Sequence, residues 1–469
     1  MRKAALHNLG CKVNAYETAA MQELLEGAGY EIVPFQERAD VYIINTCTVT
    51  NIADRKSRQM LHRARKMNPD AVVVAAGCYV QAREEGHLAV DPSVDIVIGN
   101  NRKKDLVRIL EDYLQDGAEE DGQMSRVIDI NHTGEYEELH LTKPGEHTRA
   151  YIKVQDGCNQ FCSYCIIPFA RGRVRSRSLE SVVEEVRELA RNGYREVVLT
   201  GIHLSSYGAD FREKTPDSEG PEVSGKILNR EEHFHGGQEG TDLLALIRAV
   251  HEVDGILRIR LGSLEPRIIT EEFVRTAAGL EKLCPHFHLS LQSGCDATLK
   301  RMNRRYTAAE YLEKCALLRK YFRNPALTTD VIVGFPGETE EDFQETLDLV
   351  RRVRYDAVFT FQYSRRTGTP AAVMEGQVTP EVMKDRFDRL LAEVQAISSE
   401  VCSVHTGSVQ EVLVESVNDH DPALLTGRMS NNLLVHFPGD PSLIGKLFSV
   451  RLKECRGFYY LGEGGHVLT

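Results

Sequence analysis

The stretch YIKVQDGCNQFCSYC, Tyr151 to Cys165, decides the fold of the central part of this chain. Its opening YIKVQ is typical of a strand, and Cys158, Cys162 and Cys165 follow in the next loop. Three thiolates at this spacing fit a four-iron cluster with one iron left open. A structural zinc site would need a second Cys pair or a His pair, and neither follows. We therefore predict an iron–sulfur site with one free coordination position.

Strand and helix patterns alternate after this loop. Apolar runs typical of strands recur at 196–201, 257–263, 286–292, 328–335 and 357–364, and helical patterns begin at Leu179, Asp242, Thr270, Ala308 and Glu340. About six such units fit a partial or a full βα barrel. The functional groups of that fold belong at the carboxyl ends of the strands.

A second set of cysteines lies in the first hundred residues. Apolar runs at 3–9, 41–46, 71–77 and 95–99 alternate with helical patterns, which predicts a small parallel α/β sheet. Cys11, Cys47 and Cys78 each follow one of the first three runs, and ligand sites form at that edge of a parallel sheet. One such cysteine alone is more often a buried apolar residue, but three at matching strand ends predict a second three-thiolate site. The remaining five cysteines share no pattern and are assigned to packing: Cys284, Cys295, Cys315, Cys402 and Cys455.

The fold class we predict is a multidomain α/β protein with a small antiparallel β-barrel at its C-terminal end. Short strands separated by turn residues such as NDHDP and PGDP indicate that barrel, of about five strands. The predicted ranges are a cluster domain at 1–115, a linker at 116–147, the βα barrel at 148–378 with an insertion at 209–240, a connecting helix at 379–402 and the small barrel at 403–469.

Composition limits the cellular setting and the partners. Apolar residues make up 42% of the 469 residues, and neither a signal peptide nor a membrane-spanning run is present, so we expect a cytoplasmic protein with no membrane partner. Eleven cysteines in a reducing compartment favour metal chemistry over disulfides. The net charge is −12, yet basic residues concentrate at 55–66, 171–177, 301–305 and 351–354. Such local patches can bind phosphate despite an acidic total.

At these residues the sequence resembles the radical S-adenosylmethionine methylthiotransferases across nearly its whole length. Six cysteines so placed are the hallmark of that family. Further matching stretches are IPFARGRVRSR, RLGSLEP, LSLQSGCDATLKRMNRRYT, TTDVIVGFPGETEEDF and GTPAA. The resemblance implies an N-terminal cluster domain, a radical barrel and a C-terminal TRAM domain that binds RNA.

The resemblance also implies the cofactors and their ligands. Cys158, Cys162 and Cys165 would hold the radical [4Fe-4S] cluster, and Cys11, Cys47 and Cys78 an auxiliary [4Fe-4S] cluster that carries the sulfur to be transferred. S-adenosyl-L-methionine would be used twice per product, once for the methyl group and once for the radical. An electron donor such as flavodoxin or ferredoxin is implied as a partner. Four further residues at strand ends are carried over for cofactor binding: Gly201, Glu265, Gln292 and Asp330. Each of these four could equally serve capping or turn chemistry.

Short motifs point to the substrate. NLGCKVN (Asn8 to Asn14) and TGIHLSSYG (Thr200 to Gly208) resemble the subgroup that acts on threonylcarbamoyladenosine beside the anticodon, at position 37 of transfer RNA. YSRRTGTP departs from the family, because Arg365 and Arg366 replace a usual proline. Two alternatives stay open, namely a methylthiotransferase acting on a ribosomal-protein aspartate and a non-enzymatic iron–sulfur RNA-binding protein.

A threonylcarbamoyl group presents a carboxylate, so its site should contain a basic or amide donor. The candidates are Lys12, the Arg171 to Arg177 segment, and Arg365 or Arg366. In the terminal barrel, the residues predicted to contact RNA are Arg428, Asn431, Asn432 and His436. His203, His286 and His288 are assigned to packing or hydrogen bonding.

Overall fold

A parallel sheet with the strand order β2-β1-β3-β4-β5-β6 opens the computed structural model, which describes residues 1–82, 91–116, 123–142, 148–211 and 241–468. Helix α2 packs on one face through Leu61 and Ala64, while α1 and α4 cover the other face. The elements are β1 (Lys3–Asn8), α1 (Lys12–Gly27), β2 (Glu31–Ile32), β3 (Val41–Thr46), α2 (Asn51–Met67), β4 (Val72–Gly77), α3 (Cys78–Gln81), β5 (Ile96–Ile98), η1 (Lys103–Asp105), α4 (Leu106–Asp116) and β6 (Met124–Arg126). Strands covered on both faces read as continuous apolar runs, which is why the sequence reveals this sheet.

The segment predicted as a linker contributes to this sheet. Strand β6 lies within 116–147 and pairs in parallel with β5. Its sequence MSR has no apolar run, so periodicity could not reveal it. The domain boundaries themselves stay predictions, and residues 212–240 of the predicted insertion lie outside the described residues.

Six parallel strands form the central unit, and they leave the barrel open. Strand β10 pairs with β9 and β9 with β7, while β11, β12 and β13 pair in that order. Isolated bridges Ile259↔Leu283 and Leu264↔Leu289 join the two groups. In the described part of the chain, no pairing closes β13 onto β7. The structure therefore has the partial barrel, not the full one.

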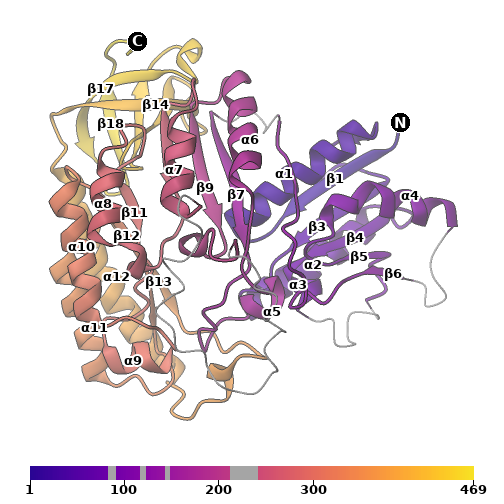
Figure 1. Cartoon of the computed structure of the whole chain (residues 1–469), viewed down its shortest axis with the longest axis horizontal. Coiled ribbons are helices and arrows are strands. Elements are labelled where there is room, and N and C mark those ends of the chain that lie inside the picture. Colours follow the sequence, from indigo (N-terminus) through magenta and orange to yellow (C-terminus); the bar gives the residue numbers. More distant parts are fainter. Residues whose placement is uncertain (83–90, 117–122, 143–147, 212–240, 469) are drawn as a thin grey trace.

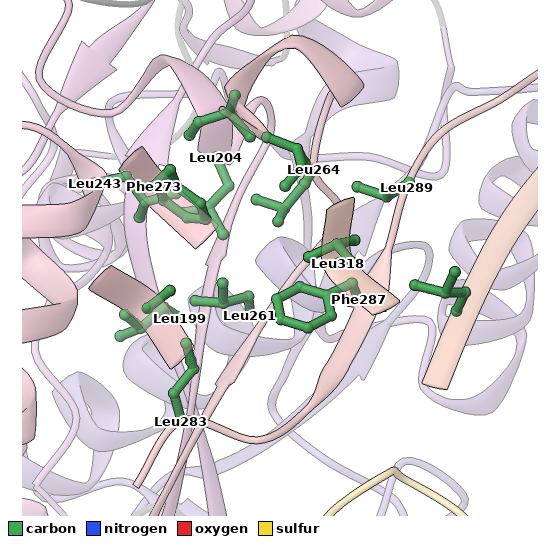
Figure 2. Packing of buried hydrophobic residues seen from close by; sticks show 14 of the residues in the cluster. Leu199, Leu204, Leu243, Leu261, Leu264, Phe273, Leu283, Phe287, Leu289 and Leu318 are labelled. Carbon is green, nitrogen blue, oxygen red and sulfur yellow. The ribbon is translucent and has the colours of Figure 1, made fainter. Parts of the chain in front are cut away.

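The elements of this unit alternate as expected. They are β7 (Arg149–Asp156), α5 (Ile167–Arg171), β8 (Arg175–Ser176), α6 (Leu179–Arg191), β9 (Glu196–Gly201), η2 (Leu204–Ser206), α7 (Leu243–His251), β10 (Arg258–Leu261), η4 (Pro266–Ile268), α8 (Glu271–Ala278), β11 (His286–His288), α9 (Asp296–Arg301), α10 (Ala308–Tyr321), β12 (Ala326–Val333), α11 (Glu340–Val353), β13 (Ala357–Gln362), η5 (Pro370–Val373) and α12 (Pro380–Ser403). Figure 2 shows the core beneath the helices, where Leu261 of β10 and Phe287 of β11 lie side by side. Burying each such side chain stabilises the fold by about 1.5–3 kcal/mol.

The C-terminal barrel is closed, with the strand order β14-β15-β16-β18-β17. Its strands are β14 (Val409–Val417), β15 (Leu424–Met429), β16 (Leu434–Pro438), β17 (Leu447–Cys455) and β18 (Tyr459–Glu463), with η6 (Pro441–Leu443) between β16 and β17. The expected antiparallel barrel is confirmed, with one exception, because β16 and β18 run parallel. An odd number of strands cannot alternate all the way around a closed ring, so one parallel pair is required.

The N-terminal sheet and the C-terminal barrel both dock on the central unit (Figure 1). Helix α1 packs against β7, and α3 packs against α5, just after the loop of Cys158 to Cys165. The C-terminal barrel is held by the side chains of Arg258 and Arg260, which donate to its backbone carbonyls at 2.7 and 2.9 Å. The two predicted cluster regions are therefore brought together.

Asp356, just before β13, couples stability to pH. Its carboxylate accepts from Leu327 N at 2.8 Å, but burial raises its pKa to about 6. The folded state therefore binds the proton more tightly than the unfolded state, whose pKa is about 3.9. This stabilisation is complete below the unfolded pKa and is lost as pH rises through 6. Between pH 5 and 7 the loss should be about 1 kcal/mol.

Asp356→Asn, which keeps an acceptor for Leu327, should flatten that dependence. The measurement is urea unfolding of both proteins from pH 5 to pH 7. Parallel stability curves for the two proteins would contradict this assignment.

Candidate metal centres

Cys11, Cys47 and Cys78 lie at the carboxyl ends of three adjacent strands. Cys47 and Cys78 directly follow β3 and β4, and Cys11 precedes α1 after β1. Asn14 ties two of these ends together, because its Nδ2 donates to Leu9 O at 2.8 Å and to Thr46 O at 3.0 Å. Cys11, Cys47 and Cys78 thus share one edge of the sheet.

Two glycines make room at this edge. Gly10 has φ +104°, and a Cβ there would lie 2.8 Å from Cys47 Sγ. Gly77 has φ +95°, and its Cβ would lie 2.5 Å from Asn45 Oδ1. Both positions demand a backbone conformation that side chains disfavour, so glycine is required beside the cysteines.

The sulfur of Cys78 receives two N–H donors. Arg171 Nε lies 3.1 Å from it and Asn100 Nδ2 lies 3.6 Å from it. Arg171 ends α5, so this contact crosses from the central unit to the N-terminal sheet. Donors aimed at sulfur suit a thiolate ligand.

Cys158, Cys162 and Cys165 occupy the loop after β7. Gln160 N points to Cys158 Sγ at 3.5 Å, and Ser163 N donates to Met302 O at 3.0 Å, which fixes the loop on the turn after α9. Burial and the neighbouring thiols raise the pKa of Cys158 and of Cys165 to about 12. Burial likewise raises the pKa of Cys47 to about 11. Crowded thiols of this kind become ligating thiolates when a cationic metal group lies between them.

Neither set of cysteines is arranged around a single metal ion. Among the residues that the structure describes, no three His, Cys, Asp or Glu side chains converge where they could hold one metal ion. Zinc needs every sulfur about 2.3 Å from the same ion. Cluster thiolates bind different irons and need not meet at one point.

Arg304 lies beside the second set. Its Nη2 donates to Tyr164 OH at 2.8 Å, and its Nε is buried with no partner among the described residues. Burial opposes the charge, but Cys162 and Tyr164 hold its pKa well above the usual value. An unsatisfied cationic donor next to cysteines fits an anionic ligand.

Of the four predicted cofactor residues, three lie at or after the end of a strand, and Asp330 does not. Gly201 ends β9, where an added Cβ would lie 2.8 Å from Gln155 Oε1, and Glu265 caps η4 while pairing with Arg267 Nε at 2.8 Å. Gln292, with φ +71°, donates its N–H to Asp330 O at 2.8 Å. The Asp330 side chain instead pairs with His288 Nε2 at 3.2 Å, within β12 rather than at its end.

A buried charge network joins the central unit to the N-terminal sheet. Glu17 of α1 accepts from Lys103 at 2.5 Å, from Lys153 at 2.8 Å and from Arg171 at 2.5 Å. Asp156 adds contacts to Lys153 at 2.6 Å and to Arg171 at 3.2 Å. Although burial acts to raise it, the pKa of Glu17 is held well below its usual value by these cations.

This network corrects one prediction. The segment from Arg171 to Arg177 was a candidate donor to a substrate carboxylate, yet its Arg171, Arg175 and Arg177 side chains are at most 1% exposed. Arg177 pairs with buried Glu185. Arg366 is also occupied, since its Nη1 contacts Asp54 at 2.7 Å. These guanidinium groups hold the structure together instead of facing a ligand.

Lys12, Arg173 and Arg365 remain as exposed cations among the candidates. Arg365 uses its Nε to bind Ala372 O at 2.6 Å. Lys12 Nζ lies 5.9 Å from the ring centroid of Tyr151 in β7 and forms no ion pair among the described residues. Its surroundings lower the pKa of Lys12 by partial enclosure and by the nearby cations Arg149, Arg260 and Arg428, with Asp330 acting in the opposite direction.

The predicted RNA contacts of the small barrel lie partly at its junction with the central unit. Arg428 pairs with Glu415 at 2.7 Å, and its carbonyl accepts from Arg258. Asn431 is buried. His436 Nδ1 lies 3.0 Å from Thr426 Oγ1, and its ring packs on Tyr459. His203, His286 and His288 are packed or hydrogen-bonded, as expected.

Sequence reasoning missed Glu17, Lys153 and Arg304. A signal existed for Glu17, because it shares the apolar face of α1 with Val13, Ala20 and Met21, where a carboxylate needs a partner. Arg304 belongs to the basic run RMNRR, a pattern typical of a solvated surface. Nothing in the sequence therefore indicated its role.

Comparisons with known proteins agree with this arrangement. Residues 3–99 match the uncharacterized protein family UPF0004, residues 152–350 the radical SAM superfamily and residues 404–463 the TRAM domain. The chain is 38% identical to threonylcarbamoyladenosine tRNA methylthiotransferase MtaB of Bacillus subtilis strain 168, covering 100% of this chain and 97% of that protein. It is also 38% identical to tRNA-2-methylthio-N(6)-dimethylallyladenosine synthase of Lachnoclostridium phytofermentans, covering 98% and 94%.

A solved structure shares the fold. The radical S-adenosylmethionine methyltransferase TsrM of Kitasatospora setae aligns with a TM-score of 0.54 at 15% identity, over 79% of this chain and 74% of that one. In the described ranges, no helix is both long and apolar enough to cross a membrane.

Proposed function

The chain belongs to the radical S-adenosylmethionine methylthiotransferases that modify transfer RNA, and from that membership we propose that it converts N6-threonylcarbamoyladenosine beside the anticodon to its 2-methylthio derivative. It is an enzyme that transfers methylthio groups, and the radical family implies one [4Fe-4S] cluster with S-adenosylmethionine. The proposal adds the substrate, a second cluster, two S-adenosylmethionine molecules per product and a protein electron donor.

The contact between Arg171 and Cys78 carries this proposal. It links the helix that follows Cys165 to a cysteine of the other set, at 3.1 Å. Cys158, Cys162 and Cys165 would hold the cluster that supplies radical chemistry at an unactivated ring carbon, and Cys11, Cys47 and Cys78 the source of sulfur. Arg171 and Glu17 then fix the distance between the two sites.

Lys12 supports the choice of substrate. Overall identity does not separate the two nucleosides, since both relatives are 38% identical to the chain. Lys12 adjoins Cys11 and presents an ammonium group without a carboxylate partner in the described part of the chain. A threonylcarbamoyl carboxylate would supply that partner, whereas an isopentenyl group would leave it unpaired.

The test is a side-by-side assay on two transfer RNAs, one carrying threonylcarbamoyladenosine and the other isopentenyladenosine, with mass spectrometry of the nucleosides. We expect methylthio product from the first only. Preference for the isopentenyl RNA would overturn the substrate, and product only on a ribosomal protein would overturn the RNA assignment.

Gly10→Ala should selectively damage the proposed auxiliary site. The added Cβ would meet Cys47 Sγ at 2.8 Å, and the positive φ penalises any side chain. Reconstituted protein should lose about half its iron, because the other three-cysteine site is independent. Reductive cleavage of S-adenosylmethionine should persist while methylthio product disappears.

The matched control for this variant is Gly27→Ala. No atom lies within 4 Å of a Cβ at that position, at the end of α1. Iron content should match the wild type. Full iron content in Gly10→Ala would show that Cys47 does not bind the cluster.

A further inference from the structure

Helix α5 and the loop between Cys158 and Cys162 together form an aromatic and cationic surface. Phe161 adopts φ +49°, a conformation unfavourable for residues other than glycine. Its ring lies edge-on to Phe169 of α5 at 6.0 Å, and the Arg173 guanidinium covers it at 4.6 Å. Phe169 is 44% exposed. We call Phe161, Phe169 and Arg173 the Phe169 patch.

Neighbouring groups hold this patch in place. Asn303 Nδ2 donates to Phe161 O at 2.9 Å and contacts Gln160 O at 3.3 Å. The turn that carries Asn303 thus fixes the unusual backbone of Phe161. The same contacts keep the half-buried ring of Phe161 one residue away from Cys162 and against the exposed Phe169.

The patch has a positive border. Arg173 is exposed, as are Lys300 and Arg305, which flank Asn303 on its turn. None of these three forms an ion pair within the described residues. In a chain of net charge −12, three cations without ion pairs around the exposed ring of Phe169 favour an acidic partner.

The patch lies beside the three-cysteine loop. Phe161 belongs to that loop, Phe169 lies in α5 and Arg173 follows α5. In Figure 1 the C-terminal barrel lies at the top of the molecule and α5 lies in its lower half. A partner docked on the patch is therefore next to the loop and away from the barrel, which favours a protein over an RNA held by that barrel.

We propose that the Phe169 patch is the docking site of a small acidic one-electron carrier protein. This rests on the proposed function, which requires an external electron. The reduced carrier loses one electron and the centre held by Cys158, Cys162 and Cys165 gains it, with no bond made or broken and no proton moved. Exposed aromatics and arginine are enriched at protein interfaces, and redox encounters use small, charge-steered ones.

The experiment compares two sources of electrons. Reconstituted Phe169→Ala and Arg173→Glu proteins are assayed for S-adenosylmethionine cleavage with reduced flavodoxin and, separately, with dithionite. We expect the KM for flavodoxin to rise at least tenfold, while the dithionite rate stays within twofold. Direct titration with flavodoxin should show the same loss of affinity, with a weaker salt dependence for Arg173→Glu.

Two further variants keep the test decisive. Arg275→Glu changes an exposed cation on α8, away from the patch, and should bind flavodoxin normally. Arg305→Glu serves if a loop variant loses iron, because its side chain lies outside the loop; it should also weaken flavodoxin binding.

Unchanged flavodoxin affinity in Phe169→Ala, Arg173→Glu and Arg305→Glu would overturn the docking site. Weakened transfer RNA binding with normal flavodoxin binding would assign the patch to RNA instead and would also overturn it. Neither result touches the methylthiotransfer itself, which is measured with dithionite.

Discussion

Arg171→Met is expected to uncouple the two cysteine sites. The substitution removes the 2.5 Å contacts to Glu17 and Asn14 and the 3.1 Å contact to Cys78, all across the boundary with the N-terminal sheet. Breaking a buried ion pair costs about 3–5 kcal/mol, because the remaining partner stays buried and charged. The first melting transition should fall by roughly 6–12 °C, and methylthio product should fall at least 100-fold. Cleavage of S-adenosylmethionine should persist, since Cys158, Cys162 and Cys165 are untouched.

Arg175→Met is the matched control. Arg175 is equally buried, but its hydrogen bonds go to Arg171 O and Arg173 O, within its own segment. Arg175→Met should lower stability, but the ratio of methylthio product to cleaved S-adenosylmethionine should stay at the wild-type value. Arg171→Lys should recover part of the stability but not the fork of contacts to Asn14 and Glu17. If Arg171→Met left the ratio of product to cleaved S-adenosylmethionine unchanged, Arg171 would have no part in coupling the sites.

The sequence was sufficient to predict where the cysteines meet. Runs such as VYIINT and AVVVAAG are apolar throughout, which identifies buried parallel strands, and parallel strands end at a common edge. The positions of Cys47 and Cys78 followed from that rule alone. The sequence could not decide whether the barrel is partial or full. Closure depends on pairing between β13 and β7, and no local sequence pattern predicts such a pairing.

The basic segment after Cys165 shows why the site was predicted less well. A run of arginines is usually a solvated surface, and only the fold reveals that Glu17, Asp156 and Glu185 lie opposite. Glu17 and Asp156 lie 154 and 15 positions before Arg171, and Glu185 lies 8 positions after Arg177, so sequence spacing does not reveal these pairs. Charge pairing between distant segments is a tertiary property.

Lys12→Met should remove the preference for the threonylcarbamoyl substrate. Lys12 is an exposed cation near Tyr151 that lacks an ion pair among the described residues, and Cys11 precedes it. A hydrogen bond to a charged group contributes about 1.5–3 kcal/mol, so kcat/KM on that RNA should fall roughly 10–100-fold. Activity on isopentenyladenosine should stay level or rise, because an isopentenyl group forms no ion pair with Lys12 that the substitution could remove. Both rates are measured by nucleoside mass spectrometry.

The pH profile distinguishes a binding role from a structural one. Enclosure and nearby guanidinium groups lower the pKa of Lys12, so the ammonium loses its proton at a lower pH than an ordinary lysine. The wild-type kcat/KM on the threonylcarbamoyl RNA should therefore decline on the alkaline side, and Lys12→Met should lack that decline. Arg365→Met, which removes another exposed candidate cation, should keep both the preference and the decline. An equal loss of activity on both RNAs in Lys12→Met would mean that Lys12 supports the site without reading the substrate.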